Sequence, residues 1–320
     1  MTQWILKILE TPEEMAAVEE LQRLVWPGNE TEIVPAHMLL AVAHNGGLVV
    51  GAYTSDSGED PEGELPELTS LAGPAELPAS RLIGFVFGFP GLYTTPDGPR
   101  SKHCSHMLGV RPDIRDRGIG FSLKRAQWQM IRHQGVDRIT WTYDPLLSRN
   151  AYLNITKLGA VCNTYRRNEY GELRDEMNTG LSSDRFQVDW WVNTRRVERR
   201  LGRRRRLQLD LAHFLAAGAE IINPSQDGAG KWPRPAATRL PNYVTEAQSG
   251  AEVPLLLLEI PADFLGLKTE DLQLAVDWRY HSRELFEELF ALGYLVTDFI
   301  YLSGTLGRSF YVLSHGESTF

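Results

Sequence analysis

Residues 115–120 place two glycines among arginines, a pattern that can bind a phosphate group. The surrounding stretch reads RPDIRDRGIGFSLKR and leads into an apparent helix. The first turn of a helix has unpaired amides and the positive end of the helix dipole, so it attracts anions. Glycine there lets the backbone approach a ligand closely. We therefore expect a phosphate to contact the following residues: Arg115, Asp116, Arg117, Gly118, Ile119, Gly120 and Phe121.

Three kinds of phosphate-binding loop compete for this stretch. A P-loop needs the pattern GxxxxGK followed by Ser or Thr, which the chain lacks. A dinucleotide fingerprint needs a third glycine, but Leu123 occupies that position. An acyl-CoA loop has Gln or Arg, two further residues, Gly, one residue, and then Gly or Ala. The segment from Arg115 to Gly120 fits this third pattern, although a plain strand–helix turn would also use glycines.

The order of motifs around the loop resembles the GNAT superfamily of N-acetyltransferases. An apolar strand, MLGV, precedes Pro112, and the loop and a helix follow. A second strand, VDRITWTYDP, then leads to a helix that ends in KLGA at residues 157–160. The resemblance covers roughly residues 4–193. The stretch from Ser105 to Ala160 also resembles one little-characterised bacterial branch of predicted GNAT proteins.

The resemblance implies an α/β (α+β) fold, with a mixed, mostly antiparallel sheet flanked by helices. Acyl-CoA, with acetyl-CoA as the expected co-substrate, would lie where the fourth and fifth strands separate. Its pantetheine arm would pair with Leu108, Gly109 and Val110, and its pyrophosphate would rest on residues 115–120. A small-molecule or peptide amine would attack the thioester directly in a ternary complex.

The resemblance also implies a proton acceptor and a proton donor. His106 is the first candidate for the base because imidazole titrates in the useful range. Asp144 and Tyr143 are the other candidate bases, although Asp144 before Pro145 also suits a turn. The family's usual tyrosine acid is replaced by Ile155, and Tyr152 could substitute. This departure supports an alternative, a degenerate GNAT-derived module that binds acyl-CoA or a partner without efficient turnover.

Composition and cysteine usage limit the other classes of function. The net charge of −8, with 42% hydrophobic and 23% charged residues, fits a globular protein and argues against binding nucleic acid over the whole surface. Cys104 and Cys162 form no pair motif, which fits a cytoplasmic protein without a structural zinc. His103 and His106 should point to opposite faces of a strand, so no metal is expected. Neither a signal peptide nor a membrane span is visible.

Periodicity and punctuation predict the elements along the chain. The expected elements are a strand at 4–10, a helix at 11–26 with Thr11 as N-cap, a hairpin at 39–53, a loop-like insertion at 54–80, strands at 81–91, 103–110, 136–145, 160–167 and 184–192, helices at 119–135 and 148–159, and in the C-terminal part a strand at 253–261, a long helix from about 269 to 292, and strands at 293–302 and 308–315.

Two regions beyond the motif suggest further organisation. Residues 194–206 hold eight arginines, which read as a solvated helix face or as an anion-binding surface. The C-terminal part repeats the order strand, helix ending LGY, strand, strand, and resembles a partial GNAT repeat without the loop. We therefore expect a GNAT domain at 1–200 and a second α/β domain at 201–320, which could form a homodimer interface.

Overall fold

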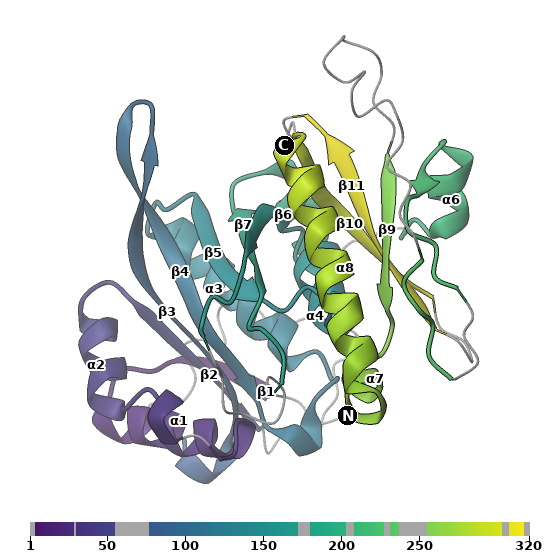
Figure 1. Cartoon of the computed structure of the whole chain (residues 1–320). Coiled ribbons are helices and arrows are strands. Elements are labelled where there is room, and N and C mark those ends of the chain that lie inside the picture. Colours follow the sequence, from purple (N-terminus) through teal and green to yellow (C-terminus); the bar gives the residue numbers. More distant parts are fainter. Residues whose placement is uncertain are drawn as a thin grey trace. The chain divides into compact units, whose positions relative to one another are not determined.

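The computed structural model describes residues 4–28, 30–54, 77–171, 180–202, 208–226, 231–236, 255–302 and 307–316. These residues form two compact units, drawn together in Figure 1. The first unit comprises residues 1–141 and 191–193, and the second comprises residues 142–190 and 194–320. Each unit is described by itself. The predicted insertion at 54–80 lies almost entirely outside the described residues, as do Arg203 to Arg206.

The helices and strands of the first unit follow the order that the sequence predicts, with one exception. Its elements are β1 (Trp4–Ile8), α1 (Pro12–Val25), α2 (Ala36–His44), β2 (Leu48–Thr54), β3 (Leu82–Thr95), β4 (Gly98–Val110), α3 (Ile119–His133) and the start of β5 (Arg138–Tyr143), with short 3-10 turns at Glu30–Glu32, Ala79–Arg81 and Pro112–Ile114.

The exception is the hairpin predicted at 39–53, which is wrong. Ala36–His44 forms helix α2, and only Leu48–Thr54 forms a strand. The segment AHMLLAVAH consists mostly of residues with good helix propensity, and Pro35 takes the N-cap position that precedes such a segment. The NGG sequence at 45–47 therefore ends a helix and does not join two strands.

Helix α1 begins where its local sequence requires. The Thr11 hydroxyl accepts a hydrogen bond from the amide of Glu14, and the Glu14 carboxylate accepts one from the amide of Thr11. This reciprocal capping box satisfies two amides that the helix leaves unpaired. Pro12 occupies the first turn, where its missing N–H costs nothing. The prediction of a Thr11-capped helix is confirmed.

The sheet of the first unit has the strand order β1-β2-β3-β4-β5. Strands β1 to β4 are antiparallel, and β4 runs parallel to β5. Helices cover both faces of this sheet. Neighbouring residues of a strand point to opposite faces, so contacts of two successive β3 residues show which helix lies on each face. Phe85 packs with the α1 residues, whereas Gly84 lies against Ile119 and Leu123 of α3. This arrangement confirms the predicted mixed, mostly antiparallel sheet flanked by helices.

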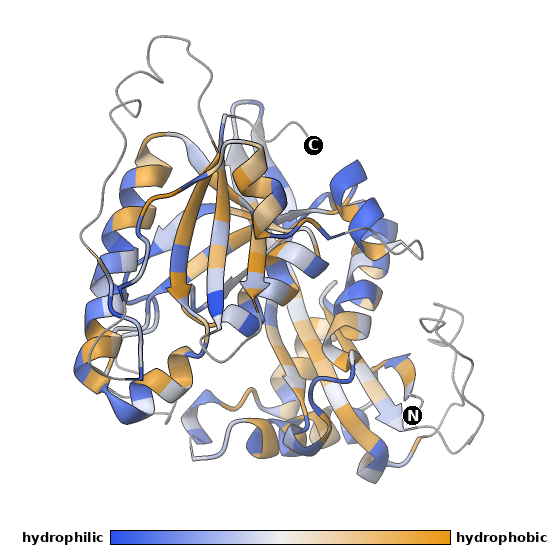
Figure 2. Cartoon of the chain, turned by 90° about the vertical axis from the view of Figure 1, so that its right-hand side faces the viewer, coloured by the Kyte–Doolittle hydropathy of each residue, from blue (hydrophilic) through white to orange (hydrophobic). Residues whose placement is uncertain are grey.

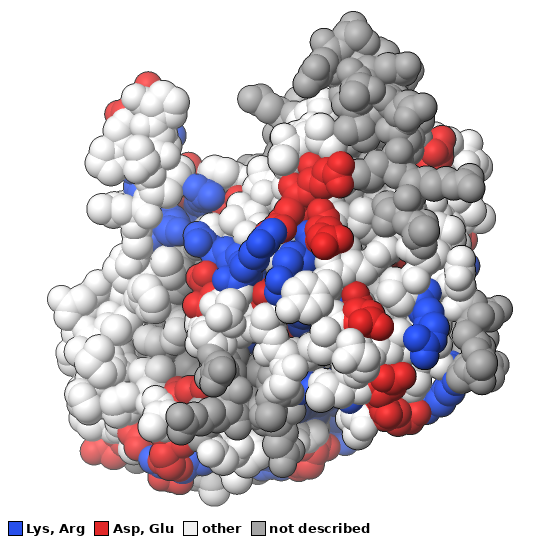
Figure 3. Space-filling view, in the orientation of Figure 1, with Lys and Arg blue, Asp and Glu red and all other residues white. Residues whose placement is uncertain are grey.

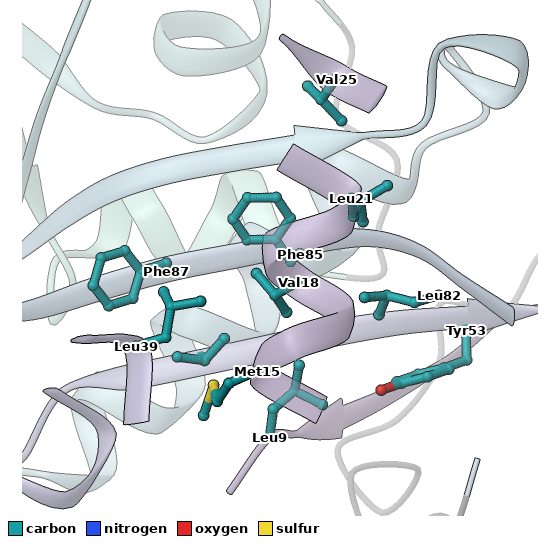
Figure 4. Packing of buried hydrophobic residues seen from close by; sticks show 11 residues of the cluster. Leu9, Met15, Val18, Leu21, Val25, Leu39, Tyr53, Leu82, Phe85 and Phe87 are labelled. Carbon is teal, nitrogen blue, oxygen red and sulfur yellow. The ribbon is translucent and has the colours of Figure 1, made fainter. Parts of the chain in front are cut away.

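The main core of the first unit lies between its sheet and helices α1 and α2. Figure 4 shows side chains of α1 resting on aromatic side chains of β3. Phe85 is fully buried, and its ring meets Trp26 edge-on with 6.1 Å between the ring centroids. Figure 2 shows that the strands carry most of the apolar colour. Burial of these side chains is the main stabilising term for this unit.

Residues 191–193 join the first unit through helix α3. The indole N–H of Trp128 donates to the carbonyl of Val192 at 2.8 Å, and the Arg132 guanidinium donates to the side chain of Asn193 at 3.0 Å. These bonds hold the end of a strand against the outer part of α3.

The second unit contains the remaining elements. They are the end of β5, α4 (Ser148–Ala151), a π-helical turn η5 (Tyr152–Lys157), β6 (Val161–Arg166), β7 (Arg185–Trp191), α5 (Arg195–Leu201), α6 (Leu211–Ala216), β8 (Glu220–Ile221), β9 (Leu256–Pro261), α7 (Phe264–Glu270), α8 (Leu272–Ala291), β10 (Tyr294–Leu302) and β11 (Arg308–His315).

The described strands of the second unit are neighbours in one sheet. The order is β7-β6-β10-β11-β9-β8, so two antiparallel pairs meet at their inner strands. Cys162 of β6 pairs with Val296 of β10 at that meeting point. The long C-terminal helix predicted from about Thr269 to Leu292 is confirmed as α8, which Asp271 caps, and the shorter helix α7 precedes it. The division into a domain at 1–200 and a second domain at 201–320, which was inferred from the order of motifs in the sequence, remains a prediction.

None of the helices in the described ranges combines the length and apolarity that crossing a bilayer requires.

The core residue Phe85 provides a test of this packing. Because its ring is fully buried between β3 and α1, Phe85→Ala should lower the free energy of unfolding by about 3–5 kcal/mol. Urea unfolding followed by tryptophan fluorescence measures the change. Leu92, on the same strand but 68% exposed, is the matched control, and Leu92→Ala should change it by less than about 0.5 kcal/mol. Equal effects of the two changes would contradict the packing described.

Candidate functional site

The glycine loop forms the start of helix α3. Gly118 is the N-cap residue and has φ of 90°, a conformation that favours glycine. Since it has no side chain, it cannot cap the first amides of α3. Asp116, just before it, also has a positive φ, 67°. Helix α3 runs for 15 residues from Ile119, so its dipole ends at this loop. The loop therefore has the backbone geometry of an anion site.

The three arginines of the loop differ in their surroundings. Arg111 pairs with Asp113 at 2.7 Å. Arg115 donates from Nε to the carbonyl of Val110 at 3.1 Å, so it fastens the loop to the end of β4. Arg117 is exposed beside the helix start. Arg117 is therefore the side chain of this group best placed to meet an incoming anion.

Strand β4 is joined to β5 over a short length only. Among the described residues, the ladder contains two pairs, His103 with Ile139 and Cys104 with Thr140. On its other side β4 continues to pair with β3 as far as Val110, opposite Gly84. The stretch from Ser105 to Val110 thus has one paired edge and one edge outside the β4–β5 ladder. Leu108, Gly109 and Val110, predicted to pair with pantetheine, lie on it.

A β-bulge interrupts β4 at His106. Phe87 faces Met107 and Gly88 faces Ser105, so His106 is an extra residue in the ladder. The bulge changes which residues point to α3. Before it His103 and Ser105 face α3, and after it Leu108 does, because Leu108 lies 3.7 Å from the position of a Cβ on Gly120. A bulge commonly reorients a side chain beside a functional site.

His106 lies on the face opposite to α3. Its ring packs against Phe87 and Phe89, with centroids 6.0 and 5.7 Å away, while part of the imidazole remains exposed. Partial removal from water lowers its pKa below the ordinary 6.5. The neutral imidazole can therefore accept a proton near pH 7. His103 points to the other face, so the expectation that the two histidines do not share a metal agrees with their geometry.

A buried polar cluster, which the sequence analysis missed, lies under β4 where the ladder with β5 ends. Lys124 of α3 is 2% exposed, and its Nζ donates to Ser105 Oγ at 2.9 Å and to Gln127 Oε1 at 2.8 Å. The same Nζ lies 3.6 Å from the ring centroid of Trp141. Gln127 Nε2 lies 3.1 Å from Nε2 of His103. We name these five residues the Lys124 cluster.

Both titratable members of the Lys124 cluster favour the neutral form. Burial lowers the pKa of His103 to about 3. The neutral imidazole then accepts from the Gln127 amide, which turns the Gln127 carbonyl towards Lys124. Burial also lowers the pKa of the Lys124 amine well below 10.5. A sequence signal existed, since Lys124 and Gln127 fall on the same helical stripe as Gly120 and Ile131.

The other predicted catalytic residues lie in the second unit. Asp144 accepts from Arg279 at 2.5 Å and, through its other oxygen, from the amide of Leu146 at 2.9 Å. The second bond forms the turn expected before Pro145. The Tyr152 hydroxyl donates to Gln208 at 3.2 Å. Ile155, at the position of the family's usual acid, is fully buried.

Part of the arginine run has a structural role in the second unit. Arg196 donates from Nε to the carbonyl of Gly159 at 2.8 Å and also to the carbonyl of Thr297. Arg200 pairs with Asp298 at 2.7 Å, and both of these side chains are mostly buried. Figure 3 shows basic side chains beside acidic ones on the face drawn. These bonds attach α5 to the end of η5 and to β10, so these two arginines do not form the solvated face that was expected.

No family model matches the chain, and no curated protein matches it. Solved structures to which it is similar are acetyltransferases. One is NAA60 from Arabidopsis thaliana in complex with a bisubstrate analogue, with 16% identity over 60% of this chain and 100% of that chain, and a TM-score of 0.40. Another is the ribosomal-protein-S18-alanine N-acetyltransferase from Escherichia coli, with 13% identity over 60% and 96%, and a TM-score of 0.39.

A third is aminoglycoside 6'-acetyltransferase type Ii, with 18% identity over 60% of this chain and 99% of that chain, and a TM-score of 0.39. TM-scores of this size carry no argument about a site. The function is therefore argued below from the loop, the helix start and the strand edge of this chain.

The lowered pKa of His103 predicts a specific pH dependence of stability. Between pH 6.5 and about 3 the unfolded chain binds a proton that the folded chain does not, so stability falls as the pH falls through this window. His103→Gln should remove a slope of up to about 1.4 kcal/mol per pH unit from the free energy of unfolding. Urea unfolding at pH 6.5, 5.5 and 4.5 measures it. The exposed His44 provides the control, and an unchanged slope in His103→Gln would contradict the assignment.

Proposed function

We propose that the chain is an acyl-CoA-dependent N-acyltransferase of the GNAT type, with acetyl-CoA as its co-substrate. The observation that carries this proposal is the position of the α3 start beside the edge of β4. A Cβ placed on Gly120 would lie 3.7 Å from Leu108 and 4.0 Å from Val110. The amides that suit a diphosphate and the strand edge that suits an amide-bearing arm are therefore contiguous.

The two halves of this surface fit different parts of acyl-CoA. The amides at residues 118–121, the helix dipole and Arg117 provide positive potential for the pyrophosphate. The pantetheine arm contains amides, so it can bond to the edge of β4 from Leu108 to Val110 in the manner of an added strand. Arg115 holds the loop in place through the carbonyl of Val110.

Acyl transfer then needs a polarised carbonyl and a proton acceptor. An amide near Leu108 would donate to the thioester oxygen, and one such donor lowers the barrier by about 3–4 kcal/mol. His106 would accept the proton of the attacking amine, which contributes a factor of about 10² to 10⁴. We assign this role to His106 rather than Asp144, because Arg279 and the amide of Leu146 engage the Asp144 carboxylate.

The proposed acceptor is a small molecule or a peptide that carries a primary amine and attacks in a ternary complex. Tyr152, whose hydroxyl donates to Gln208, remains a candidate acid, and the second unit remains a candidate for acceptor binding or homodimer formation.

A second function has one specific observation in its favour. Ile155 places a fully buried apolar side chain where the family's usual acid would be. If nothing replaces that acid, the chain would hold acyl-CoA and turn it over slowly. This alternative shares the binding site but predicts only slow transfer to any amine.

Substitution of Gly120 tests the binding site. Gly120 is not in a positive-φ conformation and a Cβ there makes ordinary contacts, so the fold should tolerate a side chain. Gly120→Glu should weaken acetyl-CoA binding at least about 100-fold, because a carboxylate would repel the pyrophosphate at the helix start. Calorimetric titration of acetyl-CoA measures the affinity.

Gly120→Ala is the matched control, and it should retain affinity within about tenfold. Gly118 is a poorer choice for this test because its φ of 90° strains any side chain. Equal affinity in wild type and Gly120→Glu would remove the phosphate assignment. No binding to the wild type would overturn the proposed function itself.

A further inference from the structure

The Lys124 cluster occupies the point where β4 and β5 separate. The parallel register pairs residue 104 with residue 140, so Ser105 and Trp141 are the first residues beyond the ladder. Lys124 contacts both, through the hydrogen bond to Ser105 Oγ and over the Trp141 ring. A buried amine thus lies directly behind the start of the open β4 edge.

The cluster also lies on the face from which the loop approaches. Ser105 and Leu108 both face α3. Residues three apart would face opposite sides in a regular strand, but the bulge at His106 shifts the alternation by one residue. Lys124 follows Gly120 by four residues, which is about 6 Å along the helix axis. His106 faces the other side of the sheet. The proposed base and the Lys124 cluster therefore reach the same stretch of β4 from opposite faces.

The reaction lacks a proton donor at the position where the sequence pattern would place one. Ile155 cannot donate, and the Tyr152 hydroxyl donates to Gln208. We propose that Lys124, acting through the Ser105 hydroxyl, supplies the proton that the leaving CoA thiolate takes up. This inference rests on the proposed function and assigns Ser105 as the catalytic donor and Lys124 as its positioning and proton-supplying partner.

Protons and electrons balance in this step. The amine nitrogen bonds to the acyl carbon, and the C–S bond breaks with its electron pair remaining on sulfur. The thiolate takes the proton of Ser105, and Ser105 takes one from the Lys124 ammonium. His106 holds the proton lost by the amine. Exchange with solvent then returns a proton to Lys124 and removes one from His106.

Binding of acyl-CoA would prepare Lys124 for this role. In the free chain burial favours the neutral amine. A diphosphate at the first turn of α3 brings negative charge within about two turns of Nζ, and a nearby opposite charge favours the ammonium. The Trp141 ring also favours a cation. Lys124 should therefore gain a proton when acyl-CoA binds.

The neighbours of Lys124 in the described part of the first unit include one other titratable side chain, that of His103. His103 on β4 reaches it through Gln127 and is itself neutral down to about pH 3. Strand β3 presents Gly84 to α3, and β5 presents the Trp141 ring. Uptake measured near neutral pH can therefore be assigned by changing Lys124, once the weaker contribution of the exposed His106 has been separated.

Calorimetry in two buffers measures this proton directly and needs no acceptor amine. The observed enthalpy of acetyl-CoA binding at pH 7.5 differs between HEPES and Tris by the number of protons taken up multiplied by the difference between the ionisation enthalpies of the two buffers. Wild type should take up protons, at most one per acetyl-CoA bound, and Lys124→Met should take up about none. Lys102→Met, on the other face of β4, and His106→Gln are the controls, and both should retain most of the uptake.

Turnover provides the second test, with any amine that the wild type acylates. Ser105→Ala should lower kcat at least about tenfold with little change in the KM for acetyl-CoA, and Ser105→Thr, which retains a hydroxyl, should recover most of it. The pH profile of kcat should lose its alkaline limb in Ser105→Ala, which a change in packing alone would not cause.

The outcomes separate the two proposals. If wild type fails to bind acetyl-CoA, the proposed function fails. If binding is intact and sensitive to Gly120→Glu, but proton uptake is zero or is unchanged in Lys124→Met, the proposed function stands and this inference is overturned. If Lys124→Met does not fold, Ser105→Ala becomes the deciding variant. An unchanged kcat and an unchanged pH profile in Ser105→Ala would also overturn this inference.

Discussion

The early separation of β4 from β5 is the constraint on which the candidate site depends. Backbone amides and carbonyls need partners, so a strand edge without a ladder must meet water, side chains or a ligand. In this chain the edge begins after Cys104, and the bulge at His106 follows at once. The bulge turns His106 to one face of the sheet and returns Leu108 to the other. A single extra residue thus gives the edge two different chemical sides.

The Lys124 cluster shows how costly groups are kept in place at that separation. A buried amine, amide and imidazole are tolerated when each has partners, and a partly satisfied network is worse than an apolar core. Gly88 makes room for the imidazole, because a Cβ there would lie 2.2 Å from Nε2 of His103. Burial of His103 lowers the stability of the fold at low pH. Burial of the neighbouring Lys124 makes the protonation of its amine sensitive to nearby charge. Stability and proposed chemistry therefore draw on one set of contacts.

Much of the first unit could be predicted from local patterns. The Thr11 cap, the strand before Pro112, the glycine turn and helix α3 each follow from short-range rules, and all are confirmed. Helix α2 was predicted as part of a hairpin because an NGG turn between apolar residues resembles both arrangements. The helix propensity of residues 36–44 favours the helix, and packing of Leu39 into the core stabilises it, a contact that no local pattern contains.

The Lys124 cluster escaped prediction for a related reason. A lysine in an amphipathic helix is usually exposed, and only the tertiary contacts with Ser105 and Trp141 show that this one is buried. The roles of Asp144 and Arg196 were ambiguous in sequence because hydrogen bonds to distant carbonyls and guanidinium groups cannot be read from spacing. Local geometry was therefore predictable, whereas the partners of charged groups were not.

The central claim is that acyl-CoA binds along the start of α3 and the edge of β4. Amide hydrogen exchange with and without CoA tests it most directly. The account predicts slower exchange at residues 118–121 and at those amides of residues 106–110 that do not pair with β3, with little change in α1 and α2. Protection confined to other elements, or none at saturating CoA, would contradict the account.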